Sequence, residues 1–62
     1  ININTADQAM LELLPGIGPT YAKRMIEYRS ENNGFSTIEE LLEIKGIGDK
    51  RLAAIRPLIT IN

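Results

Sequence analysis

A seven-residue pattern occurs twice in this chain: Leu14-Pro15-Gly16-Ile17-Gly18-Pro19-Thr20 recurs as Ile44-Lys45-Gly46-Ile47-Gly48-Asp49-Lys50, at an offset of 30 residues. Apolar positions keep this offset on both sides of the glycines: Leu11 with Leu41, Leu14 with Ile44, Ile17 with Ile47, Ala22 with Leu52 and Met25 with Ile55. Self-similarity at a fixed period indicates two copies of one supersecondary unit. We expect these repeat units at about residues 7–32 and 37–57, within a single domain that spans residues 1–62.

Length and composition exclude several classes of protein. The 62 residues include no cysteine and no histidine, which excludes disulfides, Cys/His zinc sites, thiol nucleophiles and Ser-His-Asp triads. The hydrophobic fraction of 44% is enough for a compact fold, whereas the apolar runs are too short to span a membrane. The glycine pairs have the spacing of neither a Walker loop nor a dinucleotide fingerprint. We therefore expect no enzymatic activity, no cofactor, no metal and no small-molecule substrate.

The charge is small in sum but polarised along the chain. A net charge of −1 and a pI of about 5.2 argue against nucleic-acid binding, because domains that bind nucleic acids are usually basic. Residues 1–44 carry seven acidic and three basic side chains, whereas residues 45–62 carry four basic side chains and one acidic. The C-terminal part is therefore basic although the whole chain is slightly acidic.

The first repeat unit is predicted to form a helix, a tight hairpin and a second, longer helix. Thr5 or Asp7 can cap the first helix, since both residue types accept hydrogen bonds from the first amides of a helix. The second helix is predicted over residues 19–32, with a proline at its first position, where the missing N–H is not needed. Asn33-Gly34 is expected to end this helix.

The second repeat unit is predicted to follow the same order. Thr37 and Glu40 have the spacing of a capping box at the start of its first helix. The last helix is predicted over residues 49–56, where Pro57 limits it. Phe35, between the two units, is expected to be buried as a plug.

The two ends of the chain differ from the helical repeats. Ile1-Asn2-Ile3-Asn4 and Ile59-Thr60-Ile61-Asn62 alternate apolar and polar residues, which is the period of a strand. We expect a strand of two or three residues at each end of the chain, and we expect these two strands to pair with each other. The predicted fold is all-α, a bundle of four to five short helices with a small β-pairing of the termini.

The glycine pairs suit turns that lead into helices and leave backbone donors exposed. Gly16 and Gly46 are expected in the left-handed conformation, and Gly18 and Gly48 at the start of the next helix. The first N–H groups of a helix lack partners within it, and together with the helix dipole they attract anions. Because glycine has no side chain to block a phosphate oxygen, each hairpin is predicted to hold one backbone phosphate. The isoleucine between the glycines is expected to anchor the turn in the core.

This arrangement resembles the tandem, SAM-domain-like form of the helix-hairpin-helix family of DNA-binding domains, and more narrowly the domain of the ComEA-type competence proteins. The resemblance covers almost the whole chain. It rests on Asn2-Ile3-Asn4-Thr5-Ala6, Leu14-Pro15-Gly16-Ile17-Gly18-Pro19, Ala22, Ile26-Glu27-Tyr28-Arg29, Gly34-Phe35, Glu39-Glu40-Leu41 and Lys45-Gly46-Ile47-Gly48. It implies sequence-independent binding of double-stranded DNA, with the paired hairpins contacting phosphates on both sides of the minor groove.

The resemblance also implies which residues contact DNA. The backbone donors are expected at Gly16, Ile17, Gly18, Gly46, Ile47 and Gly48. The side chains are expected at Thr20, Lys23, Arg24, Lys45, Lys50 and Arg51. Many family members carry a lysine two residues after the second hairpin glycine, which Lys50 keeps and Thr20 does not. Because Asp49 adds a negative charge beside the second hairpin, we expect weak binding, roughly 10⁻⁴–10⁻⁶ M, that falls steeply with salt.

The same residues also allow other interpretations. One alternative is a protein-interaction or scaffold domain, in which the hairpins would serve merely as structural turns. Another is the DNA-positioning module of a repair enzyme, since one fold can carry different functions. Lys23 and Arg24 also fit a solvated helix face that pairs with Glu27. Arg29 fits a bond to a helix end better than a DNA contact. Packing, rather than a stacking platform for bases, is the favoured role for the aromatic side chains Tyr21, Tyr28 and Phe35.

The opening Ile-Asn-Ile-Asn-Thr-Ala favours a DNA receptor in natural transformation over a repair enzyme. Such a receptor would be extracytoplasmic, in the periplasm or at the cell surface, and held by a membrane anchor outside this sequence. A cytoplasmic location stays open, since the absence of cysteine fits either compartment. The chain begins at Ile1 rather than at a methionine, and we interpret it as a domain of a longer protein.

Overall fold

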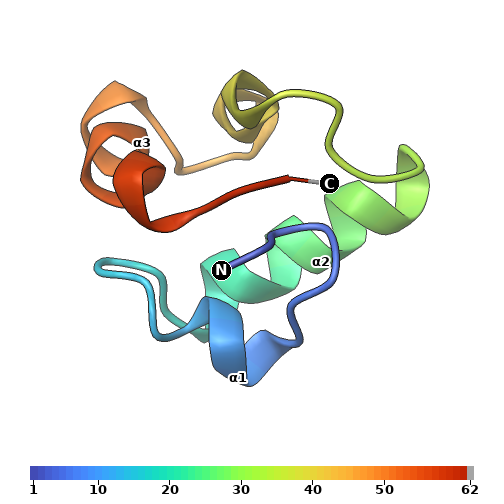
Figure 1. Cartoon of the computed structure of the whole chain (residues 1–62), viewed down its shortest axis with the longest axis horizontal. Helices are drawn as coiled ribbons and strands as arrows, with labels where there is room; N and C mark the ends of the chain where they lie inside the picture. The colour runs from blue at the N-terminus through green and yellow to red at the C-terminus, as the bar shows by residue number, and fades with distance from the viewer. Residues whose placement is uncertain (62) are drawn as a thin grey trace.

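Two helical units lie one above the other in the computed structural model, which describes residues 1–61 (Figure 1). The helices in these residues are three α-helices and two 3-10 helices, the latter labelled η. In chain order they are α1 (Gln8–Leu11), α2 (Pro19–Glu31), η1 (Ile38–Glu43), α3 (Asp49–Ile55) and η2 (Arg56–Leu58). The first unit contains α1 and α2, and the second contains η1, α3 and η2. The predicted all-α bundle of four to five short helices is confirmed.

The first unit begins its helices where the sequence predicts, although α1 ends at Leu11, before the hairpin glycines. Of the two candidate caps, Asp7 is the one used, because its Oδ1 accepts a hydrogen bond of 2.9 Å from the amide of Met10. The helix α2 ends at Glu31 with Asn32 as its C-cap, and the next two residues have positive φ angles of 59° at Asn33 and 95° at Gly34. Asparagine and glycine are the residues that tolerate this left-handed conformation, which explains the break.

The second unit starts at the predicted capping box. The Thr37 side chain accepts from the backbone at Glu40, and the Glu40 side chain accepts from the backbone at Thr37. The element that follows is a 3-10 helix of six residues, a tighter form than the α-helix of the first unit. A 3-10 helix of six residues is longer than most, since such runs usually end after three or four residues.

The Glu40 carboxylate also joins the two units. It accepts a hydrogen bond of 2.8 Å from the hydroxyl of Tyr28 on α2, besides those from the amides of Ser36 and Thr37. The bond from the Tyr28 hydroxyl, supported by the amide bonds, lowers the pKa of Glu40 below its ordinary value. The same bond raises the pKa of Tyr28. The Tyr28 ring is in turn stacked on Phe35, with ring centroids 5.0 Å apart, so both rings serve packing.

The hydrophobic core is shared by the two units. Every apolar pair that the repeat predicts is buried, and these side chains form one cluster together with Ile3, Ala6, Phe35 and Ile59. The buried pairs are Leu11 with Leu41, Leu14 with Ile44, Ile17 with Ile47, Ala22 with Leu52 and Met25 with Ile55. Because equivalent positions of both repeats point into the same cluster, neither unit has an apolar face left for a core of its own.

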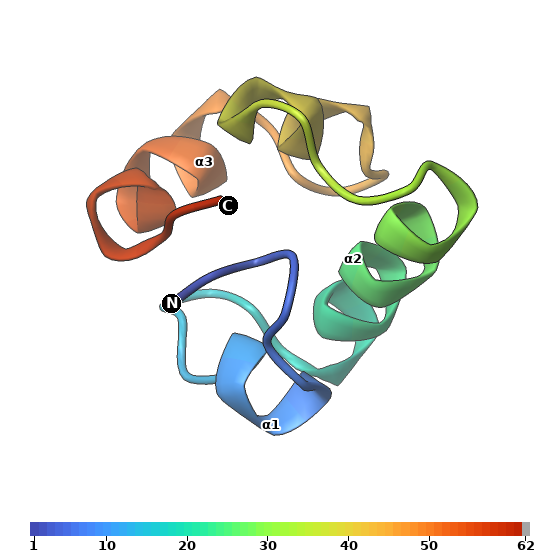
Figure 2. The ribbon, with the colours of Figure 1, turned by 45° about the vertical axis from the view of Figure 1, so that its right-hand side comes forward.

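The termini lie next to each other between the two units (Figure 2). The amide of Ile3 donates to the carbonyl of Thr60 at 3.0 Å, and the amide of Thr60 donates to the carbonyl of Ile1 at 2.8 Å. These bonds make one isolated parallel bridge between Asn2 and Thr60, rather than the strands of two or three residues that the alternation predicts. A two-stranded ribbon of this length is too short to be stable as a sheet. Asn62, in the second predicted strand, lies outside the described residues.

Asn4 attaches the N-terminal segment to the connector between the units. Its side-chain amide donates to the carbonyl of Phe35 at 3.0 Å, and its Oδ1 accepts from the amide of Phe35 at 2.6 Å. The guanidinium of Arg29 donates to the carbonyl of Ile3 at 2.9 Å, so the predicted structural role of Arg29 is confirmed, with a loop carbonyl in place of a helix end. Across residues 1–61, every helix is too short or too polar to cross a lipid bilayer.

Replacing Glu40 with glutamine is expected to remove part of the acid sensitivity of folding. A carboxylate whose pKa is lowered in the folded state stabilises the fold above its ordinary pKa of 4.5, and this stabilisation is lost as the pH falls through the lower folded value. Glu40→Gln should therefore melt at a lower temperature than the unaltered chain at pH 7. The difference in melting temperature between the two proteins should be smaller at pH 3 than at pH 7, because the stabilisation by the carboxylate declines once the pH falls below 4.5.

Thermal unfolding followed by circular dichroism at both pH values measures this effect. Glu31→Gln is the matched control, because Glu31 is an exposed glutamate at the end of α2 whose side chain makes no hydrogen bond within residues 1–61. A melting difference between Glu40→Gln and the unaltered chain that stays the same at pH 3 would contradict this account of Glu40.

Candidate nucleic-acid interface

The first glycine of each hairpin has the left-handed backbone that the sequence predicts. The angle φ is 78° at Gly16 and 95° at Gly46. Each glycine is also covered by a side chain of the other unit: a Cβ at Gly16 would lie 2.8 Å from Nη1 of Arg51, and a Cβ at Gly46 would meet the ring of Tyr21. Tyr21 and Arg51 occupy equivalent positions in the two repeats, so this cover is reciprocal. The left-handed conformation therefore favours glycine at both positions, and at Gly46 the ring of Tyr21 also leaves no room for a Cβ.

The isoleucine of each hairpin anchors the turn, as predicted. Ile17 and Ile47 are buried, with only 3% of each residue exposed. Their amides are not free, however, because Ile17 donates to the carbonyl of Leu14 at 3.1 Å and Ile47 donates to that of Ile44 at 3.0 Å. The prediction that these two amides are unpaired donors is therefore wrong. The tight turn that buries the isoleucine side chain also brings its N–H onto the preceding helix end.

The second glycine of each hairpin is the N-cap of the following helix. The angle φ is −93° at Gly18 and −105° at Gly48, which is a conformation open to any residue. A Cβ at either position would meet nothing within 4 Å. Glycine is therefore not needed here for the backbone, and it leaves open space in front of the helix ends.

Unpaired backbone donors lie at this open space. Within residues 1–61 no acceptor is hydrogen-bonded to the amides of Gly18, Thr20 and Tyr21, and neither N-cap has a side-chain hydrogen bond. The same holds in the second hairpin for the amides at the equivalent positions, Gly48, Lys50 and Arg51, and for Asp49, which has an N–H where the first hairpin has a proline. The second hairpin thus offers one more donor, although the Asp49 carboxylate next to it is exposed.

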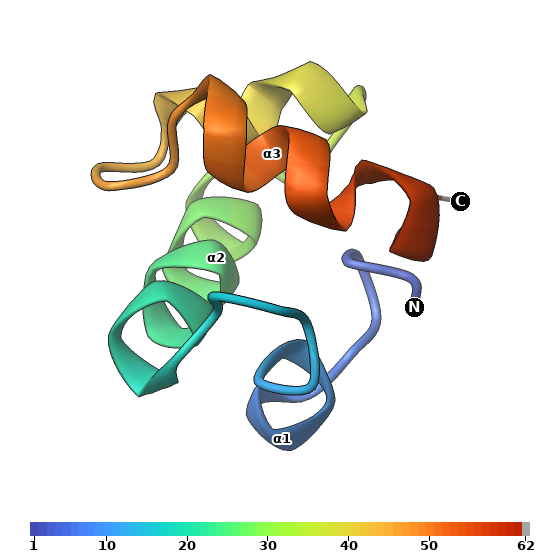
Figure 3. The same ribbon diagram turned by 90° about the vertical axis from the view of Figure 1, so that its left-hand side faces the viewer.

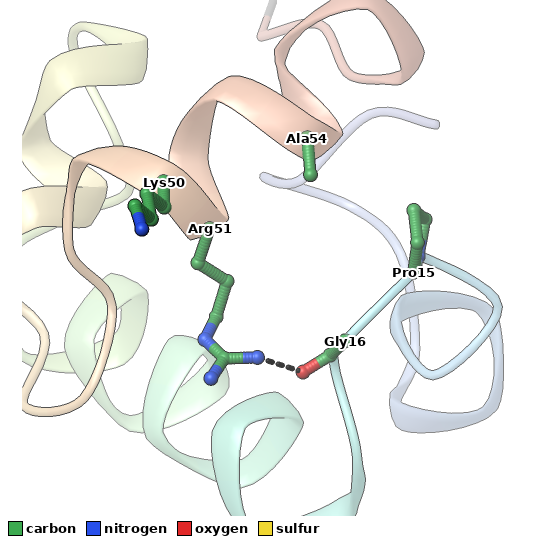
Figure 4. Close-up of a pocket in the computed structure, with 5 residues that line it drawn as sticks. All are labelled: Pro15, Gly16, Lys50, Arg51 and Ala54. Carbon is green, nitrogen blue, oxygen red and sulfur yellow. Dashed lines mark hydrogen bonds between the residues drawn. The ribbon is translucent and has the colours of Figure 1, made fainter.

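Two arginines that the sequence assigns to DNA contact bind the hairpin backbone in this structure. Nη1 of Arg51 donates to the carbonyl of Gly16 at 2.7 Å (Figure 4). Its Nε donates to the carbonyl of Gly46 at 3.3 Å. Arg24, on α2, donates to the carbonyl of Lys45 in the other hairpin at 2.8 Å. Both guanidinium groups lie over the ring of Tyr21, at 4.5 Å from its centroid for Arg51 and 5.6 Å for Arg24. The two arginines and Tyr21, here called the clasp, therefore join the hairpins side by side.

The remaining arginines are also engaged within the fold. Arg29 holds the N-terminal segment, and Arg56 forms an ion pair of 2.8 Å with Glu39. The bond from Arg56 lowers the pKa of Glu39. The proposed pairing of Lys23 or Arg24 with Glu27 does not form in the described part of the chain.

The three lysines differ from the arginines in this respect. Lys23, Lys45 and Lys50 are exposed, and in residues 1–61 their side chains have neither a hydrogen bond nor an ion pair. An arginine presents a planar set of donors that fits carbonyl oxygens, whereas lysine carries a flexible point charge that stays hydrated. The structure therefore separates basic side chains that build the hairpins from basic side chains that are available to a ligand.

An open hollow brings residues of both units together. It is lined by Pro15, Gly16, Lys50, Arg51 and Ala54 (Figure 4). Lys50 belongs to the second repeat, yet it lines this hollow beside the first hairpin. Figure 3, turned so that the left-hand side of Figure 1 faces the viewer, shows α3 and the turn that leads into α2 on this side.

Sequence reasoning missed Tyr21 as part of this site. The signal was present, because Tyr21 and Arg51 each follow the second hairpin glycine by three residues and so occupy one position of the repeat. Their roles could not be read from the sequence, since only the packing of the units places each one over the first glycine of the other hairpin. Thr20, which stands where the second repeat has Lys50, is exposed at the start of α2.

Comparisons with known proteins agree with this architecture. A family model described as "Helix-hairpin-helix motif" matches residues 1–60. The chain is 43% identical over 62 residues to ComE operon protein 1 of Bacillus subtilis (strain 168). This match covers 100% of this chain and 30% of the relative. The chain is 37% identical to the Danio rerio protein named "Endonuclease/exonuclease/phosphatase family domain-containing protein 1", and 36% identical to the Homo sapiens protein of that name.

The vertebrate matches cover the whole of this chain but 11% of each relative. The chain thus spans less than a third of the length of these curated relatives, and the shared part is the doubled hairpin itself. The family model covers nearly every residue, and the structure contains helix–hairpin–helix units, as the description of the model states. The chain belongs to the helix-hairpin-helix family.

Proposed function

We propose that this chain binds double-stranded DNA without reading its sequence, through one backbone phosphate at each hairpin. The observation that supports this most is the pair of equivalent helix starts, each with unpaired amides behind a glycine that leaves open space. The clasp holds the two hairpins side by side, so both can engage one ligand. A duplex offers phosphates on two strands across the minor groove, which suits two neighbouring anion sites.

The amides that serve as donors are those of Gly18 and Thr20 in the first hairpin and those of Gly48, Asp49 and Lys50 in the second. This set keeps Gly18 and Gly48 from the sequence prediction and adds amides at the helix starts, since the isoleucine amides are occupied within the hairpins. Gly16 and Gly46 contribute to the site through their turn geometry, with Arg51 and Tyr21 packed against them.

Charge for phosphate binding comes from the three lysines. Lys23 lies on α2 after the first hairpin, Lys45 lies in the second hairpin, and Lys50 follows it. All three side chains are exposed and unpaired in the described residues, so each can approach a phosphate without breaking a bond in the fold. Three lysines opposed by Asp49 make a small positive field, which is consistent with affinity near the weak end of non-specific binding, about 10⁻⁴–10⁻⁶ M.

A role in DNA uptake during natural transformation is the cellular function we favour. The support is the similarity to ComE operon protein 1, which extends over the whole chain at 43% identity. In that role the domain works outside the cytoplasm as the DNA-holding part of a longer, membrane-anchored protein. The domain itself acts without catalysis, since its candidate site consists of backbone amides and lysines.

The vertebrate relatives favour a second candidate function. Their name refers to an endonuclease/exonuclease/phosphatase family domain, and the part that matches this chain is 11% of their length. In that setting the hairpins would position DNA for a catalytic domain elsewhere in the protein. Deleting the gene and measuring uptake of labelled DNA separates the two roles, because a DNA-positioning module of a nuclease leaves uptake unchanged.

Closing the space in front of the hairpins is expected to weaken DNA binding while the fold is kept. Gly18→Val and Gly48→Val each place a branched side chain over the unpaired amides, at positions where the backbone accepts any residue. Loss of charge-assisted bonds at one hairpin should lower duplex affinity about tenfold. Fluorescence anisotropy with two duplexes of unrelated sequence measures this loss, and both duplexes should give the same result.

Ser30→Val is the control, since it adds the same side chain at an exposed position near the opposite end of α2. Circular dichroism of all variants checks that they remain folded. Unchanged duplex affinity in folded Gly18→Val and Gly48→Val proteins would sink the proposed function.

The lysines, rather than the arginines, are expected to set the salt dependence of binding. Each phosphate contact made by a lysine contributes about 0.9 to the slope of log K against log of salt concentration. Replacing Lys23, Lys45 and Lys50 one at a time with glutamine should therefore reduce this slope by about one unit for each contact. Arg56→Gln serves as the comparison, because the charge of Arg56 is already paired with Glu39. Equal slopes for all four variants would remove the lysines from the interface.

A further inference from the structure

The Arg51 side chain reaches both hairpins with one rigid group. Its Nη1 bonds the carbonyl of Gly16 at 2.7 Å, and its Nε bonds the carbonyl of Gly46 at 3.3 Å. Both nitrogens belong to the same planar guanidinium, whose internal geometry is fixed by conjugation. The carbonyls of the two first glycines are therefore held at a separation that the guanidinium itself determines.

The Tyr21 ring supports this group from the other unit. The guanidinium carbon of Arg51 lies 4.5 Å from the ring centroid, and the ring also covers Gly46. Arg24 adds a bond from α2 to the carbonyl of Lys45 at 2.8 Å. The hairpins are thus linked in both directions, from the second unit to the first by Arg51 and from the first to the second by Arg24.

Fixed spacing matters because binding at two points depends on geometry. Once one phosphate is held, the second binds as an intramolecular event, and its contribution is greatest when the spacing already matches the ligand. Ordering two hairpins at the moment of binding would instead cost free energy that reduces affinity. A clasp that is already formed in the free protein avoids this cost.

We propose that Arg51 is a positioning residue which sets the distance between the two phosphate sites, rather than a phosphate ligand. The inference rests on the proposed function, and it changes the role that the sequence assigns to this side chain. Two of its three nitrogens donate to protein carbonyls, and the half-buried side chain is packed on an aromatic ring, whereas the lysines are exposed and have no such partners in residues 1–61. Its effect on DNA is therefore exerted through the hairpins.

A double-mutant cycle distinguishes positioning from direct contact. Arg51→Met keeps an apolar side chain over Tyr21 but removes both hydrogen bonds, and it should weaken duplex binding about tenfold in the unaltered chain. In a Gly18→Val background, where one hairpin is already closed, only one phosphate site remains and its spacing no longer matters. The same Arg51→Met change should then alter the affinity by less than about twofold. A phosphate ligand would instead cause the same loss in both backgrounds.

Arg51→Lys provides a second and independent measurement. Lysine keeps the positive charge but cannot bond two carbonyls with one planar group. We expect Arg51→Lys to lose affinity as Arg51→Met does, and to keep the full slope of log K against log of salt concentration. Recovery of duplex affinity by Arg51→Lys would overturn the proposal, since charge alone would then be sufficient.

Folding is checked in every variant by circular dichroism and by the dispersion of amide resonances. If Arg51→Met does not fold, the cycle is repeated with Arg51→Lys in place of Arg51→Met, with the same two backgrounds and the same expected result. Arg56→Met is the matched control, because it also replaces an arginine and its hydrogen bond, at a position that contacts neither hairpin.

The failure of this proposal is distinguishable from the failure of the proposed function. If Gly18→Val and Gly48→Val bind duplex as well as the unaltered chain, the hairpins do not hold phosphates and both proposals fall. If these variants lose affinity while Arg51→Met causes equal losses in both backgrounds, DNA binding at the hairpins stands and Arg51 is a direct ligand.

Discussion

The packing of two equivalent apolar faces against each other is the constraint on which the rest of the structure depends. Leu11 and Leu41, or Met25 and Ile55, occupy the same position of the repeat and are buried in the same cluster. A buried side chain of this size contributes roughly 1.5–3 kcal/mol, and a unit of about 30 residues cannot bury enough of them alone. The two hairpins are brought together because the helices that carry them share this core.

Joining the hairpins divides the basic side chains into two groups. The arginines bond carbonyls or a carboxylate of the fold, whereas the lysines remain exposed. The hairpin carbonyls that the arginines contact have no other hydrogen-bond donor in the described residues. A guanidinium satisfies them because it carries several N–H donors. The low net charge of the chain is therefore distributed unevenly, with the free positive charge placed at and just after the hairpins.

The chain ends and the connector complete the structure by hydrogen bonds rather than by a sheet. Asn4 holds the connector at Phe35 through two bonds, and the Asn2–Thr60 bridge closes the molecule between the units. Glu40 links η1 to α2 through the Tyr28 hydroxyl while it caps its own helix. These contacts join segments far apart in sequence, so the relative position of the hairpins depends on more than the core.

Local features of the chain followed from the sequence alone. The repeat, the capping residues Asp7 and Thr37, the break at Asn33-Gly34 and the buried apolar pairs each depend on neighbours within a few residues or on the repeat itself. Tertiary structure alone decided which basic side chains are free and which bond the hairpin carbonyls. A guanidinium near a glycine turn can donate to several carbonyls or to a ligand. The distance between the two packed units decides which of these acceptors lies within hydrogen-bond reach.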